Sequence, residues 1–275
     1  MKLTLSAQNG PALAELRPPP VTDQAAAPGR RVRMRLPQYR GSALFHTLYL
    51  PPDYTPDRPW PVIFEYPGNG PFTSKWGDES SGMVESCNLG YGLTGGRHWI
   101  WVGLPFVAAG QRRHCLSWWG DADQTAAYCQ EVVRDTVAHW RGDPERLALS
   151  GFSRGAIASS FIGLRDDTIA ALWRGLIACS HFDGVTPWPY PGSDAESAQQ
   201  RLRRLKGRPV LFCHEQTPPP APDLFHSTCE FIRRSALDMQ WTALPLPFYN
   251  HNNTWLLRDS PERRRAVEWF QAHMG

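Results

Sequence analysis

The sequence contains no long hydrophobic run. No stretch of its 275 residues approaches the roughly 20 apolar residues that cross a bilayer as a helix. Residues 1–6 also lack the apolar core of a secretory signal. We therefore expect no membrane-spanning helix and take the cytoplasm as the default location, although a leader removed beforehand would leave no trace.

Cysteine is scarce as well. The six cysteines form no C-x-x-C pair and are too widely spaced for a disulfide scaffold or a zinc site. We expect no metal and interpret most of these residues as small buried hydrophobic side chains. Cys179 and Cys213 close two successive predicted strands, and the sequence leaves open whether they form a disulfide.

Charge of one sign is not concentrated anywhere in the chain. The net charge is +3 and the arginines are mixed with Asp and Glu, which argues against nucleic acid or an anionic membrane as a partner. The densest basic run, residues 201–206, has helical spacing and is typical of a solvated helix face. Nothing in the sequence indicates an oligomeric state.

The length and composition predict one large domain. A chain of 275 residues with 41% hydrophobic content suits a single α/β core better than two small ones. Residues 1–29 are rich in Pro and Ala and are predicted to form an N-terminal arm. The remaining segment, residues 30–275, is predicted to be the single folded domain.

The hydrophobic pattern predicts an α/β fold. Residues 31–36 and 43–50 alternate and indicate an antiparallel hairpin at one edge of a sheet. Helical patterns, the clearest of them at 126–140 and after Ser260, then separate continuous apolar strands. Such strands are typical of a mainly parallel central sheet with helices on both faces. The predicted strands lie at 62–66, 98–102, 147–150, 175–179, 209–213 and 241–246.

The motif G-x-S-x-G at residues 151–155 carries the clearest chemical signal. It lies between a predicted strand and a helix-like run, the context of a nucleophile elbow. A serine on this sharp turn is pushed out above the sheet, and the flanking glycines avoid a collision with neighbouring backbone. We therefore predict that Ser153 is a nucleophile.

A serine nucleophile needs a histidine to accept its proton. His251 lies in a polar loop between the last predicted strand and the last helix, at the carboxyl edge of the sheet. The alternatives are less suitable, because His273 lies on the terminal helix and His46 and His98 are predicted to lie within strands. His251 is the predicted base.

The carboxylate that orients the histidine is not determined by the sequence. Glu215 follows the strand at 209–213 almost at once, and Asp183 follows the preceding strand in a segment with a permissive glycine. Asp223 lies beyond a Pro-rich stretch and would require a long loop to fold back. We favour Glu215 and keep Asp183 and Asp223 as alternatives.

Two further features are predicted at the same edge. The N–H of Arg154, the residue after the nucleophile, and that of Asn69, beside Gly68 in a glycine-rich loop after a strand, are predicted to stabilise an oxyanion. Exposed aromatic residues in nearby loops would bind a sugar ring, an aromatic acyl group or an apolar chain. They are Trp118, Trp119, Trp188 and Tyr190.

On these residues the chain resembles the α/β-hydrolases. The resemblance runs from about Arg31 to the C-terminus, and the approach to the elbow at 143–151 is similar to that of polyhydroxybutyrate-depolymerase-like, feruloyl and acetylxylan esterases. Pro67 stands where a histidine often precedes the oxyanion glycines, and the usual Gly-x-x-Asp is missing after Cys213. The resemblance implies an α/β-hydrolase fold and ester hydrolysis through an acyl-serine without any cofactor.

The sequence thus predicts a serine carboxylic-ester hydrolase that acts on a small-molecule, carbohydrate-linked or aromatic ester. A serine peptidase or amidase would use the same three side chains. A third hypothesis is a binding protein on a hydrolase scaffold whose catalytic residues have decayed, because a fold alone does not give a function.

Overall fold

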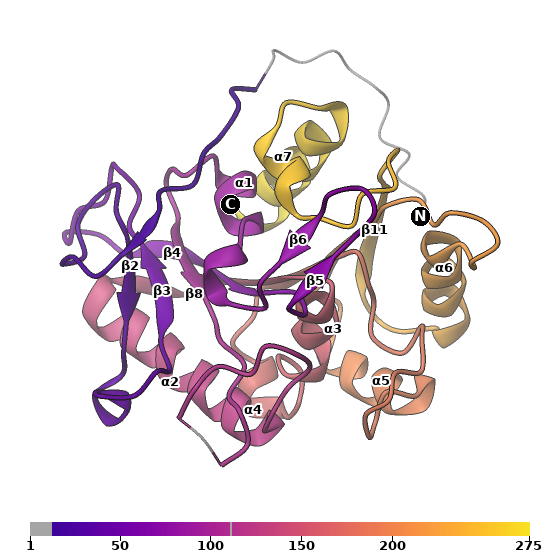
Figure 1. The fold of residues 1–275 in the computed structure, drawn as a ribbon, viewed down its shortest axis with the longest axis horizontal. Helices are drawn as coiled ribbons and strands as arrows, with labels where there is room; N and C mark the ends of the chain where they lie inside the picture. Colours follow the sequence, from indigo (N-terminus) through magenta and orange to yellow (C-terminus); the bar gives the residue numbers. More distant parts are fainter. Residues whose placement is uncertain (1–12, 111) are drawn as a thin grey trace.

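A nine-stranded sheet organises the chain (Figure 1). The structure is a computed structural model that describes residues 13–110 and 112–275. The strand order in the sheet is β1-β2-β3-β7-β4-β8-β9-β10-β11, and β5 and β6 form a separate two-stranded hairpin. The strands are β1 Val21–Thr22, β2 Arg31–Met34, β3 His46–Tyr49, β4 Trp60–Tyr66, β5 Phe72–Thr73, β6 Glu79–Ser80, β7 Ile100–Gly103, β8 Gly142–Phe152, β9 Gly175–Cys179, β10 Pro209–His214 and β11 Gln240–Pro245.

The helices alternate with the strands from β4 onward. The α-helices are α1 Leu89–Thr94, α2 Ala122–Trp140, α3 Arg154–Phe161, α4 Asp167–Ala170, α5 Ala195–Leu202, α6 Leu224–Ser235 and α7 Pro261–Met274. Short 3-10 turns lie at Pro37–Tyr39, Val84–Ser86, Arg203–Leu205 and Thr254–Leu257. Among the described residues, no helix is both long and apolar enough to cross a membrane.

The strand directions agree with the α/β prediction. Strands β7, β4, β8, β9, β10 and β11 are parallel to one another, and β3 is antiparallel to both β2 and β7. The predicted hairpin is therefore the β2–β3 pair. The predicted arm contributes β1, which pairs in parallel with β2 and forms the outermost strand on that side.

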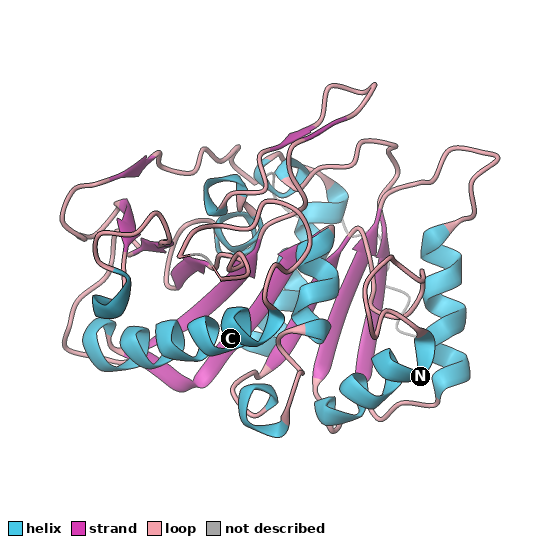
Figure 2. Ribbon diagram, turned by 60° about the horizontal axis from the view of Figure 1, so that its bottom comes forward, coloured by secondary structure: helices cyan, strands magenta, loops and turns pink. Residues whose placement is uncertain are grey.

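Helices lie on both faces of the sheet (Figure 2), and a hydrophobic cluster fills the space on each face. Successive strand side chains point to opposite faces, so the alternate residues of one strand join different clusters. In β8, Leu147 and Leu149 belong to the cluster that contains residues of α2 and α3, whereas Ala148 and Phe152 belong to the one that contains residues of α1 and α7. Helices on both faces were predicted, and the fold confirms them.

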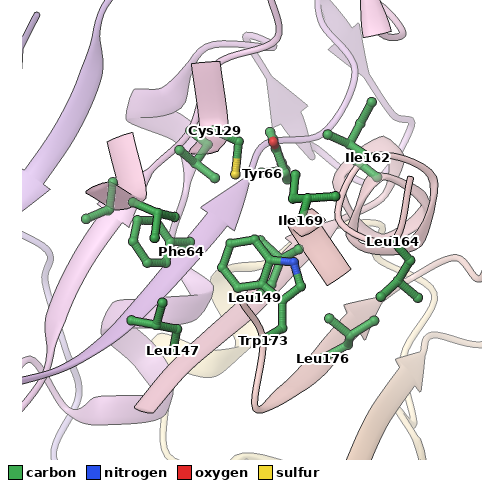
Figure 3. Packing of buried hydrophobic residues seen from close by; sticks show 14 of the residues in the cluster. Phe64, Tyr66, Cys129, Leu147, Leu149, Ile162, Leu164, Ile169, Trp173 and Leu176 are labelled. Atoms are coloured by element: carbon green, nitrogen blue, oxygen red, sulfur yellow. The ribbon is translucent and has the colours of Figure 1, made fainter. Parts of the chain in front are cut away.

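The larger cluster fills the space between the central strands and the helices on one face (Figure 3). Phe64 and Leu149 are fully buried there, and the Trp173 ring meets Phe64 edge to face at 5.7 Å. Each fully buried side chain of this size stabilises the fold by about 1.5–3 kcal/mol relative to exposure. The central strands are therefore a rigid base for the loops at their carboxyl ends.

Cap residues fix the ends of the long helices. Asp121 accepts the N–H of Gln124 at the start of α2, and Arg141 adopts a left-handed conformation at its end. Ser260 accepts the N–H of Arg263 and precedes a proline at the first position of α7. The end of α2 at Trp140 and the start of α7 after Ser260 agree with the sequence, whereas α2 begins at Ala122, four residues before the predicted pattern.

Two local predictions were wrong. The strand predicted at 147–150 begins earlier, at Gly142, because the segment after α2 pairs at once with β4 through Trp60. His98 was predicted to lie within a strand, but it precedes β7 with a positive φ of 63°. Its ring and N–H both contact Asp53, which holds the residue in an exposed turn.

All six cysteines are free thiols in the structure. Cys179 and Cys213 are register partners on the parallel strands β9 and β10, which accounts for their closeness without a bond. Five of the six are buried, as expected for small hydrophobic side chains, and Cys115 is half-buried.

Candidate active site

The G-x-S-x-G motif forms a sharp turn between β8 and α3. Strand β8 ends at Phe152, helix α3 begins at Arg154, and Ser153 between them adopts φ 55° and ψ −117°. A positive φ is unfavourable for a residue with a Cβ and is maintained only where the surrounding structure enforces it. The serine is thus held in a strained position at the carboxyl edge of the sheet.

The two glycines of the motif are required by close backbone contacts. A Cβ added to Gly151 would lie 2.0 Å from the carbonyl oxygen of Gly155. A Cβ added to Gly155 would lie 2.1 Å from the carbonyl oxygen of Tyr66 on β4. Neither position accepts a side chain, so the glycines allow the turn and pack α3 against the strand beside it.

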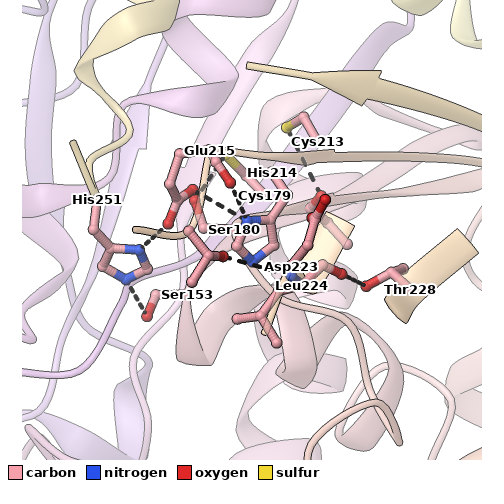
Figure 4. A network of polar contacts seen from close by, with 12 residues as sticks. Ser153, Cys179, Ser180, Cys213, His214, Glu215, Asp223, Leu224, Thr228 and His251 are labelled. Carbon is pink, nitrogen blue, oxygen red and sulfur yellow. Dashed lines mark hydrogen bonds and ion pairs between the residues drawn. The ribbon is translucent and has the colours of Figure 1, made fainter. Parts of the chain in front are cut away.

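Ser153, His251 and Glu215 form a hydrogen-bonded series at the carboxyl edge (Figure 4). The distance between Ser153 Oγ and His251 Nε2 is 2.9 Å, and that between His251 Nδ1 and Glu215 Oε1 is 2.5 Å. With Nδ1 donating to the carboxylate, Nε2 of the neutral ring is left to accept the serine proton. The arrangement brings together the three residues that the sequence favoured.

The surroundings of Glu215 keep its carboxylate ionised. Burial acts to raise the pKa of Glu215, but the hydrogen bond and charge of His251 outweigh it, with contributions from His214 and the Ser180 hydroxyl, and leave the pKa below its usual value. Ser180 is fully buried with a φ of 75°, a strained conformation that places its hydroxyl against the acid.

The two alternative acids have other partners. Asp183 is buried and accepts hydrogen bonds from Ser160 Oγ at 2.8 Å and from Arg201 Nε at 2.9 Å. Asp223 caps α6 by accepting the N–H of His226. Both carboxylates are therefore engaged in holding helices, and neither contacts His251 in the described part of the chain.

The loop that carries His251 is fixed by a carboxylate that sequence reasoning did not select. Asp78, just before β6, accepts the backbone N–H of His251 at 3.0 Å and the side-chain amides of Asn250 and Asn252. It also accepts the hydroxyl of Ser74 at 2.6 Å. The β5–β6 hairpin thus holds the loop that carries His251 through the carboxylate of Asp78.

The loop after β4 lies directly beside Ser153. A Cβ added to Gly68 would lie 3.1 Å from the Phe152 ring and 3.4 Å from Ser153 Cβ. The side chain of Asn69 is held by a neighbouring loop, since its Oδ1 accepts the N–H of Trp118 at 2.8 Å. Among the described residues, the N–H groups of Asn69 and Arg154 have no acceptor, which leaves them available beside Ser153.

Comparison with solved structures decides the fold. One similar structure is a poly(3-hydroxybutyrate) depolymerase from Bordetella parapertussis, with a TM-score of 0.55 at 19% identity. The match covers 90% of this chain and 92% of the depolymerase chain. Another is an S-formylglutathione hydrolase from Agrobacterium tumefaciens, with a TM-score of 0.58 at 13% identity. That match covers 89% of this chain and 95% of the hydrolase chain. The chain has the α/β-hydrolase fold.

Other comparisons place limits on what this chain shares with its neighbours beyond the fold. An isopeptidase, AtxE2, matches 89% of the chain over 40% of its own length, with a TM-score of 0.54 at 14% identity. Liver carboxylesterase B-1 of Rattus norvegicus is 30% identical over 156 residues, which are 53% of this chain and 27% of the carboxylesterase. The chain thus spans about a quarter of that relative. No family model matches the sequence.

The predicted aromatic loops meet each other. The Trp118 ring lies 5.3 Å from the Trp188 ring and 5.1 Å from the Tyr190 ring, and all three side chains are half-buried. His181 continues the series, with its ring 5.4 Å from Trp188 and 5.5 Å from His251. We name these four residues, His181, Trp118, Trp188 and Tyr190, the aromatic wall.

Trp119 was predicted to be an exposed pocket residue, and this prediction was wrong. It is only 5% exposed, and its ring stacks on Phe161 of α3 at 4.8 Å. Trp118 has a positive φ of 53°, and its half-buried ring meets the buried Trp119 ring edge to face at 5.7 Å. Trp119 therefore belongs to the core.

Two hollows border the histidine loop. One of about 740 Å³ is lined by Phe152, Asn250 and Trp76 among others, and a second of about 660 Å³ is lined by Glu215, His214 and others. Neither is lined by the four residues of the aromatic wall. The segment that leads to and carries His251 thus borders both hollows.

Several residues around the site carried no signal in the sequence. Asp78 lies in an ordinary turn, and its contact with His251 joins segments 173 positions apart. The strain at Ser180 is a backbone property that its residue type does not indicate. His181, two residues after β9, and His214, the last residue of β10, place their rings 5.7 Å apart, a contact between neighbouring strand ends that neither local sequence indicates.

Proposed function

We propose that the protein is a serine ester hydrolase whose nucleophile is Ser153. The observation that carries the proposal is the continuous hydrogen-bonded series from Ser153 Oγ through the His251 ring to Glu215, with distances of 2.9 and 2.5 Å. This is the arrangement by which a serine hydroxyl becomes nucleophilic at neutral pH. The α/β-hydrolase fold and its esterase neighbours support the same reaction class.

The reaction proceeds in two halves. Ser153 Oγ attacks the ester carbonyl while His251 Nε2 takes its proton, and the N–H groups of Arg154 and Asn69 stabilise the oxyanion. Collapse of the tetrahedral intermediate breaks the acyl–oxygen bond, and His251 returns the proton to the departing alcohol. Water, deprotonated by His251, then hydrolyses the acyl-serine and restores the enzyme. Glu215 orients the ring and stabilises its charged form throughout.

The aromatic wall is proposed to bind one part of the ester. It extends from His251 to Trp118 as a series of ring contacts between 5.1 and 5.5 Å, so a group bound to the serine lies next to a broad apolar surface. Burial lowers the pKa of His181 to about 3, and the ring is therefore neutral and serves as an aromatic surface. An aromatic or sugar ring fits such a surface.

Fluorophosphonate labelling tests the proposal. The wild type should be labelled at Ser153, as shown by mass spectrometry of its peptides, and should hydrolyse p-nitrophenyl acetate. Ser153→Ala should fold normally, take up no label and lose several orders of magnitude of turnover. Failure of the wild type to be labelled would favour a binding protein on the same scaffold. Faster cleavage of a matched anilide than of the ester would favour a peptidase or amidase.

A further inference from the structure

The side chain of Arg154 is a buried cation without a counter-ion. The residue is 1% exposed, and no carboxylate pairs with it in the described part of the chain. Its guanidinium lies 3.9 Å from the centre of the Phe106 ring. Burying an unpaired charge is costly, and burial lowers the pKa of Arg154 to about 9. The group is still protonated at neutral pH.

Backbone carbonyls take the place of the missing counter-ion. Nη2 donates to the carbonyl oxygens of Gly68 at 2.8 Å and Gly82 at 3.3 Å, and Nη1 donates to those of Cys115 at 3.2 Å and Trp118 at 2.5 Å. The acceptors belong to three separate loops at the carboxyl edge of the sheet. One planar fork therefore joins all three loops, which a single-point ammonium does not do equally well.

The contact with Gly68 has a particular geometric effect. The peptide between Gly68 and Asn69 is planar and trans, so its C=O and its N–H point in opposite directions. Because the C=O of Gly68 is directed at the guanidinium, the N–H of Asn69 is directed away from it. The Asn69 side chain is fixed as well, through its bond to the N–H of Trp118. Rotation of this peptide would break the hydrogen bond between Gly68 and the guanidinium.

We infer that Arg154 is a positioning residue for the oxyanion hole: its guanidinium holds the peptide that presents the Asn69 N–H. This inference rests on the proposed function, in which the main-chain N–H of Arg154 is the other donor. One residue then supplies one donor directly and orients the second through its side chain. A donor held in place before the reaction stabilises the oxyanion without any cost of reorganisation.

The test replaces the side chain and leaves the main-chain donor in place. Arg154→Met removes the fork but retains an apolar stem against Phe106. We expect kcat for p-nitrophenyl acetate to fall about 100- to 1,000-fold, the loss that follows removal of one oxyanion donor, with little change in KM. Arg154→Lys keeps the charge but not the planar fork, so its kcat should lie between those of Arg154→Met and the wild type.

A thionoester substrate reports on the oxyanion hole itself. Sulfur is a weaker hydrogen-bond acceptor than oxygen, so an intact hole favours the oxygen ester over p-nitrophenyl thionoacetate. In Arg154→Met this preference should decrease along with kcat. A side chain that only supports the fold would lower the rates of both esters equally.

Arg31 provides a matched control. It is also buried, donates to three backbone carbonyls and lies 4.0 Å from an aromatic ring, that of Trp101, but its acceptors lie at Val84–Cys87. Arg31→Met should lower the melting temperature and leave the oxygen-to-sulfur preference unchanged in the folded fraction. If Arg154→Met does not fold, Arg154→Lys is measured in the same assays.

The outcomes separate this inference from the proposed function. If the wild type hydrolyses the ester through Ser153 but folded Arg154→Met and Arg154→Lys keep both kcat and the oxygen-to-sulfur preference, the inference is wrong and the function stands. An equal loss on both esters would also overturn it. If Ser153→Ala is as active as the wild type, the proposed function itself fails.

Discussion

The carboxylate of Asp78 accepts the backbone N–H of His251 at 3.0 Å. The contact joins the short β5–β6 hairpin to the loop before α7, and the same carboxylate binds the side-chain amides of Asn250 and Asn252. The position of the histidine ring is therefore set from two sides: by Glu215 through Nδ1 and by Asp78 through the main chain. Changes at Asp78 should affect both stability and turnover.

Asp78→Ala should destabilise the protein and slow the reaction. It leaves the partly buried donors of the histidine loop without their charged acceptor, which costs about 1–3 kcal/mol. Asp78→Asn retains one acceptor oxygen for the His251 N–H and should lie closer to the wild type. Urea unfolding and kcat on a p-nitrophenyl ester measure the two effects. Wild-type stability and turnover in Asp78→Ala would show that the hairpin does not position the loop.

The acid stability of the protein should depend on Asp78. Burial acts to raise the pKa of Asp78, but hydrogen bonds from Ser74, Asn252, Asn250 and the His251 backbone outweigh it and lower the pKa. A carboxyl group with a lowered folded-state pKa contributes stability above its unfolded pKa, and the contribution is lost as pH falls through the folded pKa. The free energy of unfolding between pH 6 and pH 3, measured by urea titration, should therefore decrease less in Asp78→Asn than in the wild type. Equal slopes would contradict this.

Replacing Glu215 should cut turnover without removing the nucleophile. Glu215→Gln no longer fixes the tautomer of His251 or stabilises its charged form, and kcat should fall about 1,000- to 10,000-fold. Asp223→Asn is the control, because Asp223 follows the same strand but only caps α6. It should retain full turnover. A loss in Asp223→Asn comparable to that in Glu215→Gln would reopen the assignment of the acid.

The reaction rate should fall as pH is lowered because only the neutral His251 ring accepts the serine proton. The lowered pKa of Glu215 keeps that carboxylate ionised well below neutrality, so it should add no second decline in the neutral range. A profile of kcat/KM against pH should therefore show one acidic limb. His251→Ala should abolish the limb together with the activity, and a His251→Ala variant as active as the wild type at pH 8 would refute the role of the histidine.

The aromatic wall should discriminate between esters by size. Trp118→Ala or Trp188→Ala should lower kcat/KM for a bulky aromatic or sugar ester more than for an acetate ester, since the small group does not reach the lost surface. Loss of about 1–3 kcal/mol of indole contact corresponds to roughly a 5- to 100-fold change in the ratio of kcat/KM for the bulky ester to kcat/KM for the acetate ester. Trp173→Ala, in the core against Phe64, should lower stability instead and leave this difference between the two esters unchanged. Equal losses on both esters in Trp118→Ala would show that the wall is only packing.

The strand-and-helix pattern and the serine turn were accessible from the sequence because both depend on local rules. Apolar runs separated by helical periodicity indicate buried parallel strands, and the glycines at 151 and 155 allow a turn that other residues block. His251 was accessible for a related reason, since it lies between the last strand and the last helix of the fold.

The acid could only be ranked, because the choice depends on contacts between distant segments. Asp183 and Glu215 both follow strands of the sheet, and local sequence does not distinguish them. Arg201, on a helix that begins after Asp183, pairs with that carboxylate and leaves Glu215 for the histidine. Which of Trp118 and Trp119 is buried likewise could not be predicted, because Trp118 has a left-handed backbone conformation that its residue type does not indicate.

The nucleophile and the segment that supports the acid are joined to the sheet by its own hydrogen bonds. The N–H of Ser153 donates to the carbonyl of Cys179 at 2.8 Å, and the N–H of Ser180 donates to that of Cys213 at 2.7 Å. The spacing between these segments is therefore the spacing of neighbouring strands, about 4.8 Å each. We therefore expect Ser153 to keep its position on heating until the pairing of β8, β9 and β10 is lost.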